Sequence, residues 1–154
     1  MSSSSRCRGI GLVLLVGASA CAAVPRDPDG TLERVREART FSVGVIAPGP
    51  HATDRRHHEA FLDGVSRRTN ASPAVTVGAA ERLLSELEAG RLDLVIGELA
   101  ERSPWREHVT MLPPLRAAAH GEAATVLAVA GRHGENAWLA VLFDEVTRIN
   151  GAAR

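Results

Sequence analysis

The chain has 154 residues, of which 45% are hydrophobic, and its formal net charge is zero. This length and composition predict one soluble domain that buries a core. The 18 basic residues, all of them arginine, are scattered among 18 acidic residues. Because the charges are balanced and mixed, nucleic-acid binding has no electrostatic support, and we exclude that class of partner.

Residues 1–20 have the features of a secretory signal peptide. Two arginines precede a short apolar run, Ile10–Val16, which is too short to span a membrane. The next small residues and Cys21, in the order Gly-Ala-Ser-Ala-Cys, resemble the lipobox of bacterial lipoproteins. This resemblance implies cleavage before Cys21 and lipidation of that cysteine, with several acyl chains to hold the protein at a membrane. The alternative is an ordinary signal peptide with a chance cysteine.

Residues 21–30, rich in proline, aspartate and glycine, predict a tether that leads into a folded domain at residues 31–150. Helical and strand patterns alternate along this domain. In chain order we expect a helix at Thr31–Arg39 with Thr31 as its N-cap, a strand at Phe41–Ile46, a helix at His57–Thr69, a strand at Ala74–Gly78, a helix that begins at Ala80, a strand at Leu92–Ile96, a short strand at His108–Leu112, a strand at Thr125–Ala130 and a helix at Asn136–Asn150.

The stretch from Ala80 to Trp105 gives the clearest pattern in the chain, a helix followed by a buried strand and a polar segment. Its three leucines at helical spacing form one apolar stripe, and Gly90 stands where a left-handed residue usually ends a helix. The apolar run that follows is typical of a strand covered on both faces, and we expect Gly97 to end it. The polar residues Glu98–Arg106 would then lie just beyond the carboxyl end of that strand.

The order strand, helix, strand, helix, strand requires right-handed crossovers and a parallel three-stranded core. We therefore predict a single three-layer α/β lobe with a mostly parallel sheet of about five strands. Ligands of such sheets bind at the carboxyl ends of the strands. The residues that we expect to contact a ligand at that edge are Pro48, His51, Glu98, Arg102, Ser103, Trp105 and Arg106.

Three stretches resemble the family 3 bacterial extracellular solute-binding proteins, the receptors of ABC importers for amino acids and similar small polar molecules. They are TLERVREARTFSVGVIAPGP, LLSELEAGRLDLVIGELAERSPWREHVTMLPPL and GENAWLAVLFDEV, and Leu83–Gly97 is the most specific part. The resemblance implies a periplasmic-binding-protein-like fold, an extracytoplasmic location, a small polar ligand, an importer permease as partner, and no catalytic activity.

The chain departs from this family in two ways. Family members insert a second lobe after the position of Pro114, but only ten residues separate Pro114 from Thr125 here, so the second lobe is missing. The family also uses an arginine to grip the ligand carboxylate. Trp105 stands at that position and Arg102 stands where a threonine is common. Pro50 and His51 stand where an aromatic residue often follows the first strand.

Other kinds of site have less support. His51, His57, His58 and Asp54 could be imagined around a metal, but they lack a recognised ligand spacing. Ser103, Glu107 and His108 could be imagined as a nucleophile set, but no nucleophile-elbow motif is present. We therefore predict no metal, no cofactor and no enzyme.

Two function classes remain within this interpretation. One is a binding module that captures a small ligand or docks on an importer. The other is a degenerate, non-transport lipoprotein that acts as a protein-interaction module. A lone lobe presents half of a two-lobed pocket, so we expect weak affinity for a free amino acid, on the order of millimolar or worse. Self-association or a protein partner would then cover the site, with Trp105 as the expected anchor.

Overall fold

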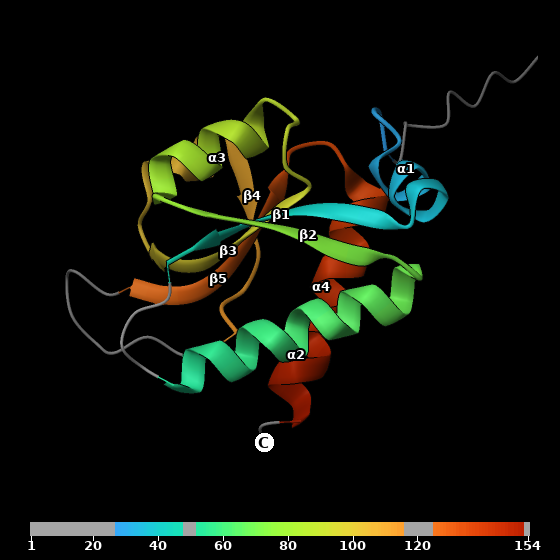
Figure 1. Cartoon of the computed structure of the whole chain (residues 1–154). Helices are drawn as coiled ribbons and strands as arrows, with labels where there is room; N and C mark the ends of the chain where they lie inside the picture. Colours follow the sequence, from blue (N-terminus) through green and yellow to red (C-terminus); the bar gives the residue numbers. More distant parts are fainter. Residues whose placement is uncertain (1–26, 48–51, 116–124, 153–154) are drawn as a thin grey trace, which may run out of the picture.

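The computed structural model describes residues 27–47, 52–115 and 125–152. Together they form one α/β lobe (Figure 1). Its elements are α1 (Thr31–Ala38), β1 (Thr40–Ile46), α2 (Ala52–Thr69), β2 (Ser72–Gly78), α3 (Ala80–Glu88), β3 (Leu94–Ala100), the 3-10 helix η1 (Pro104–Glu107), β4 (Val109–Met111), β5 (Thr125–Arg132) and α4 (Asn136–Ala152). Within these ranges no helix is long and apolar enough to cross a membrane.

The five strands form one sheet in the order β2-β1-β3-β5-β4. β1 is parallel to β2 and β3, whereas β5 is antiparallel to both β3 and β4. Four strands therefore run in one direction and β5 alone runs in the other. The predicted parallel three-stranded core and the mostly parallel sheet are both confirmed.

Helices cover both faces of this sheet (Figure 1). In β3, Leu94 and Ile96 join the hydrophobic cluster beneath α1, α2 and α4, while Val95 and Leu99 join the cluster beneath α3. Successive side chains of a strand point to opposite faces, so a strand covered on both sides needs apolar residues at every position. The predicted three-layer arrangement is confirmed.

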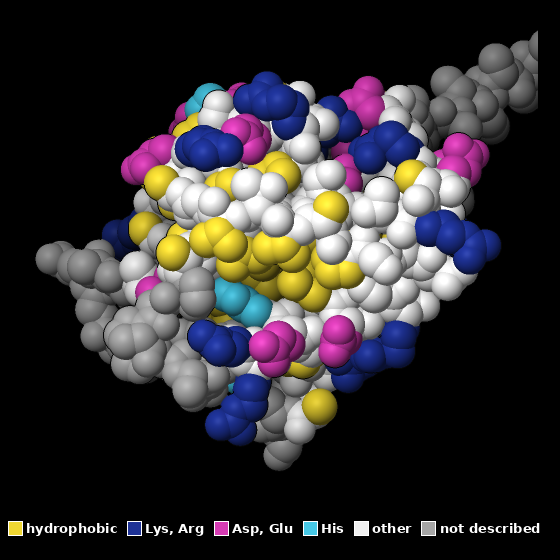
Figure 2. Space-filling view, viewed as in Figure 1, with side chains coloured by type: hydrophobic (Ala, Val, Ile, Leu, Met, Phe, Trp, Pro, Cys, Tyr) yellow, Lys and Arg dark blue, Asp and Glu magenta, His cyan; other side chains and the backbone are white. Residues whose placement is uncertain are grey.

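β2 lies at one edge of the sheet and is exposed along its length. Val75 and Val77 are 51% and 60% exposed, and an apolar band is visible over this edge (Figure 2). The strand begins two residues earlier than predicted and contains Pro73. Proline is tolerated there because an edge strand has only one neighbour to bond.

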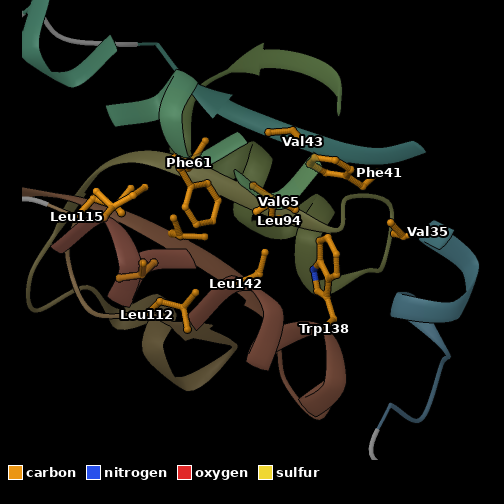
Figure 3. Close-up of a cluster of buried hydrophobic side chains, with 14 of the residues drawn as sticks. Val35, Phe41, Val43, Phe61, Val65, Leu94, Leu112, Leu115, Trp138 and Leu142 are labelled. Carbon is orange, nitrogen blue, oxygen red and sulfur yellow. The ribbon is translucent and has the colours of Figure 1, made fainter. Parts of the chain in front are cut away.

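The larger core cluster joins β1 and β3 to α1, α2 and α4, and Figure 3 shows part of it. The rings of Phe41 and Trp138 lie with their centroids 5.9 Å apart. The indole Nε1 of Trp138 donates a hydrogen bond of 2.7 Å to the backbone oxygen of Asp93, just before β3. Leu112 and Leu115 are also buried, because the chain beyond β4 continues alongside β5.

The ends of several elements differ from the prediction. Thr31 was predicted as the N-cap of α1, but it is the first residue of the helix, and Gly30, with a φ of 62°, is the N-cap. The backbone N–H of Thr31 donates to the carboxylate of Glu135. α2 begins at Ala52 instead of His57. Gly90 has a φ of 73°, as predicted for the residue that reverses the chain after α3.

Candidate functional site

The carboxyl ends of β1, β2 and β3 meet at one edge of the sheet. Ile46 at the end of β1 lies beside Gly78 at the end of β2, and Val45 lies beside Ile96 of β3. β3 continues past this level to Ala100 and stays paired with β5. The edge therefore has a step, with the last residues of β3 standing beyond the ends of its parallel neighbours.

Gly97 lies at the base of this step. We expected it to end the strand, and that prediction was wrong, because β3 continues through it to Ala100. A Cβ at Gly97 would stand 2.5 Å from the Cβ of Ile46. The absence of a side chain at Gly97 lets the end of β1 approach β3 at this edge.

Two of the predicted ligand residues remain at the step. Glu98 is half-buried, and by strand alternation its side chain points to the same face of the sheet as Leu94 and Ile96. Arg102 follows in the turn after β3 and is exposed. Glu98 and Arg102 are thus both near the carboxyl end of β3, Glu98 on the face of Leu94 and Ile96 and Arg102 at the start of the segment that follows the strand.

The polar stretch Glu98–Arg106 is not the single edge loop that we predicted. Its first three residues belong to β3, and a turn follows in which the N–H of Ser103 donates to the backbone oxygen of Ala100 at 3.1 Å. η1 comes next. Ser103 caps it, because its Oγ accepts a hydrogen bond of 3.3 Å from the N–H of Trp105.

The chain then leaves the carboxyl edge. Ala100 pairs with Thr125, whereas Val109, at the start of β4, pairs with Arg132 at the other end of β5. Seven residues of strand separate these levels, a length of about 23 Å at ~3.3 Å per residue. Residues 101–108 cross that length on the α3 side of the sheet, since His108 Nδ1 lies 2.9 Å from a carboxylate oxygen of Glu88 at the end of α3.

Trp105 lies in this crossing segment. It is half-buried and packs against the α3-side core cluster, with its ring centroid 5.6 Å from that of His108. The guanidinium of Arg106 turns back, and its Nε donates to the backbone oxygen of Glu101 at 2.9 Å. Tertiary packing thus directs Trp105 onto the protein's own core, and the ligand contacts predicted for Trp105 and Arg106 stay predictions.

Pro48 and His51 lie outside the described residues, as does Cys21. The segment that contains Pro48 and His51 follows β1 directly. Their predicted roles stay predictions.

The alternative sites can also be placed. Across the described ranges, no group of histidine, cysteine and acidic side chains could hold a metal ion. Ser103 caps η1 while His108 contacts Glu88. The hydroxyl and the imidazole are thus each engaged in a separate structural contact, and no nucleophile pair is formed between them.

The structure also contains buried charges that the sequence analysis missed. The carboxylate of Asp93, at the start of β3, accepts 2.7 Å hydrogen bonds from the N–H of Ser42 and from the guanidinium of Arg34. It joins β1, β3 and α1 at the end of the sheet opposite the step. An acidic residue directly before an apolar strand was the available signal, and its role here is structural.

A second buried acid, Glu135, ties the N-terminal segment to the start of α4. Its carboxylate accepts hydrogen bonds from the N–H groups of Asp29 and Thr31 at 3.0 and 3.1 Å. Burial, with a hydrogen bond and repulsion from Glu135, raises the pKa of Asp27 to about 6. Burial alone would raise the pKa of Glu135 too, but hydrogen bonds from Asp27, Thr31 and Asp29 lower it to about 2.

No protein-family model and no curated protein sequence matches the chain. Solved structures do match. The chain is similar to the arginine-bound form of domain 1 of the arginine-binding protein from T. maritima, with a TM-score of 0.62 and 14% identity over 75% of this chain and 97% of that domain.

Two further structures are similar to the chain. One is an amino-acid ABC transporter substrate-binding protein from Streptococcus pneumoniae bound to L-arginine, with a TM-score of 0.65 and 7% identity over 80% of this chain and 93% of that chain. The other is an arginine-specific periplasmic binding protein from Salmonella typhimurium, with a TM-score of 0.58 and 12% identity over 73% and 94%. The predicted resemblance is confirmed at the level of the fold, and a single lobe accounts for it.

Proposed function

We propose that this chain is an extracytoplasmic solute-binding lobe for a small ligand of the amino-acid class, held at a bacterial membrane by a lipid on Cys21. Its activity is binding and docking on an importer permease, without catalysis. The observation that carries the proposal is the match to an isolated domain 1 in an arginine-bound form. A single lobe of this fold, without its partner lobe, is thus an arginine-bound unit in that relative.

The chemistry at the step of the sheet supports this ligand class. An amino acid carries an ammonium group and a carboxylate. In our assignment the half-buried carboxylate of Glu98 accepts from the ammonium, and the exposed guanidinium of Arg102 pairs with the carboxylate. Pro48 and His51 would extend the same edge from the segment after β1. Ser103 has its Oγ occupied by the cap of η1, so it contributes less.

The open edge limits the affinity that we expect. The ion pair of Arg102 stays solvated, and exposed pairs contribute roughly 0–1 kcal/mol. Trp105 stands at the position of the family's carboxylate-binding arginine and packs against the core, so that arginine's bidentate contact with the ligand is missing. Dissociation constants for free amino acids should therefore be on the order of millimolar, which corresponds to about −4 kcal/mol.

The test is a titration of the full-length chain with arginine and then with neutral and acidic amino acids, followed by residue-resolved NMR shifts. We expect saturable shifts at Gly97, Glu98 and Arg102. Arg102→Gln should weaken binding by up to about fivefold, the equivalent of about 1 kcal/mol. Arg91→Gln, at another exposed arginine that lies before the start of β3, should change nothing. Shifts confined to other surfaces, or none at all, would refute the site.

A further inference from the structure

The segment that leads into α1 is held to the rest of the domain by polar contacts. Residues 27–30 have the sequence Asp-Pro-Asp-Gly, and Pro28 and Asp29 are exposed. They lie beside the turn that joins β5 to α4 (Figure 1). A segment that buries little apolar surface opens at a lower free energy than the core of a domain. Hydrogen bonds and charges therefore decide whether this segment stays attached.

Glu135 is the centre of this attachment. It is 1% exposed, and its two carboxylate oxygens accept hydrogen bonds from the N–H groups of Asp29 and Thr31 at 3.0 and 3.1 Å. The guanidinium of Arg132 contacts Asp29 and lies 3.3 Å from Glu135, so it joins the same two parts of the chain. Hydrogen bonds to a carboxylate favour its ionised form. Glu135 therefore stays ionised at mildly acidic and neutral pH, with a pKa of about 2.

Asp27 brings a second carboxyl group against Glu135. Its Oδ2 accepts a hydrogen bond of 2.7 Å from the N–H of Leu32, whereas its Oδ1 is buried and no donor among the described residues reaches it. The carboxyl group of Asp27 also lies within hydrogen-bond range of the Glu135 carboxylate. Two ionised carboxylates repel each other, but a protonated Asp27 donates to Glu135. The contact between the two acids is therefore favourable only when they share one proton.

The surroundings of the pair do not compensate a second negative charge. The charged groups that face the pair from α1, from the chain before β3, from β5 and from the N-terminal segment are Glu33, Arg34, Asp93, Arg132 and Asp29. Both arginines already bind acids, Arg34 at Asp93 and Arg132 at Asp29 and Glu135. The N–H of Leu32 favours ionised Asp27, but burial and Glu135 outweigh it and raise the pKa of Asp27 to about 6.

We propose that residues 27–30 are a pH-sensitive latch, which is closed while Asp27 and Glu135 share one proton and is released when both are ionised. The closed latch ties the start of α1 to the start of α4. Its advantage is fully present below pH 3.8, the ordinary value for Asp27, and is lost as the pH rises through about 6. Release is local, because the two hydrophobic clusters on the faces of the sheet stay packed.

Release of the latch changes the reach of the domain. Five residues separate Cys21 from Asp27, so at roughly 3.3–3.6 Å per residue Cys21 lies at most about 20 Å from the closed latch. With residues 27–30 released, the connection extends to Thr31 and spans at most about 35 Å. A lobe held by a lipid on Cys21 can then stand farther from the membrane at neutral pH. This consequence rests on the anchor of the proposed function, whereas the latch itself does not.

The test is hydrogen exchange of single backbone amides in the full-length chain, measured by NMR at about pH 5 and pH 7.5 and corrected for the intrinsic rate at each pH. The N–H groups of Asp29 and Thr31, the latch amides, both donate to Glu135. Their protection should fall about fivefold to tenfold at the higher pH. The N–H of Ser42 is the matched control, because it donates to the buried Asp93, whose carboxylate is paired with an arginine. Its protection should not change.

Asp27→Asn separates the shared proton from other effects of pH. The amide of the variant can donate to Glu135 and its carbonyl can accept from Leu32, so the latch amides should keep the same protection at both pH values. Asp63→Asn, on an exposed position of α2, should behave like the native chain. Melting curves check that both variants are folded, and the comparison within the native chain stands without them.

Three results would overturn the latch. They are unchanged protection of the latch amides in the native chain, an equal loss at Ser42, and a loss that persists in folded Asp27→Asn. The measurement needs no solute and no membrane. A failed latch is therefore distinguishable from a failed binding site at the step of the sheet and from a missing lipid anchor.

Discussion

The buried carboxylate of Glu145 on α4 occupies the space that a side chain at Gly64 on α2 would need. Glu145 is 1% exposed, and the Nε atoms of Arg68 and Arg148 donate to it at 3.0 and 2.9 Å. Burial would raise the pKa of Glu145, but hydrogen bonds from Arg148 and Arg68 and their charges lower it. The glycine therefore makes room for an ionised carboxylate that clamps α2 to α4.

The first prediction tests this clamp. In Gly64→Ala the new methyl group overlaps the carboxylate, so the variant should lose about 1–3 kcal/mol of unfolding free energy. Gly151→Ala is the matched control, because it is also a helical glycine and a Cβ there would meet nothing within 4 Å. It should be neutral or slightly stabilising. Urea unfolding of both variants measures the difference, and equal midpoints would contradict the clamp.

A second prediction concerns pH and the pair Asp27 and Glu135. Folding raises the pKa of Asp27, so its contribution to stability is present below the unfolded value of 3.8 and is lost as the pH rises through about 6. Folding lowers the pKa of Glu135 from 4.5, so its contribution is present above that value and is lost as the pH falls through about 2. The pair stabilises the fold most at acidic pH, when it holds one proton.

Asp27→Asn should remove the loss of stability as the pH rises through about 6, because an amide can donate to Glu135 without a charge. At pH 7.5 the variant should be more stable than the native chain by about 1 kcal/mol, roughly 3–6 °C in Tm. The other charged groups near the pair, Glu33, Arg34 and Arg132, are unchanged in this comparison. Asp63→Asn, an exposed control, should keep the native pH profile. If the unfolding free energies of the native chain and of Asp27→Asn changed with pH in the same way, a proton shared by Asp27 and Glu135 would be excluded.

The third prediction is that Trp105→Ala costs stability. Its ring packs against the α3-side cluster, and the loss should be about 1–3 kcal/mol, below that of a fully buried tryptophan. Arg102→Ala, three residues earlier and exposed, should stay within about 0.5 kcal/mol of the native chain. Thermal unfolding compares them. If Trp105→Ala unfolds like the native chain, the ring does not contribute to the core.

The fourth prediction concerns lipidation. The small residues before Cys21 predict cleavage and acylation there, so Cys21→Ser should release the protein from membranes or stall its processing. Cell fractionation and gel mobility measure both effects. Cys7→Ser lies in the segment to be removed and should leave both unchanged. An unaltered membrane fraction and mobility for Cys21→Ser would contradict the lipid anchor.

The amino-acid sequence by itself determined the order of the elements and the fold class. Periodic leucines in residues 80–88, the apolar run of β3 and Gly90 are local signals, and each depends on neighbours within a few positions along the chain. Together they imply parallel crossovers, because that is how alternating strands and helices bury their apolar faces. The resemblance to solute-binding proteins also rested on such contiguous segments.

Tertiary structure alone decided what individual residues do. Gly97 looked like a strand end, but it is the position where Ile46 of a distant strand approaches. Trp105 stays a predicted ligand or partner contact, and only the pairing of β4 with β5 placed its segment over α3, where the ring packs against the core. Glu145 is buried because α4 packs against α2 at Gly64. Each outcome depends on contacts between residues far apart in sequence, and local periodicity carries no information about which distant residues meet in the fold.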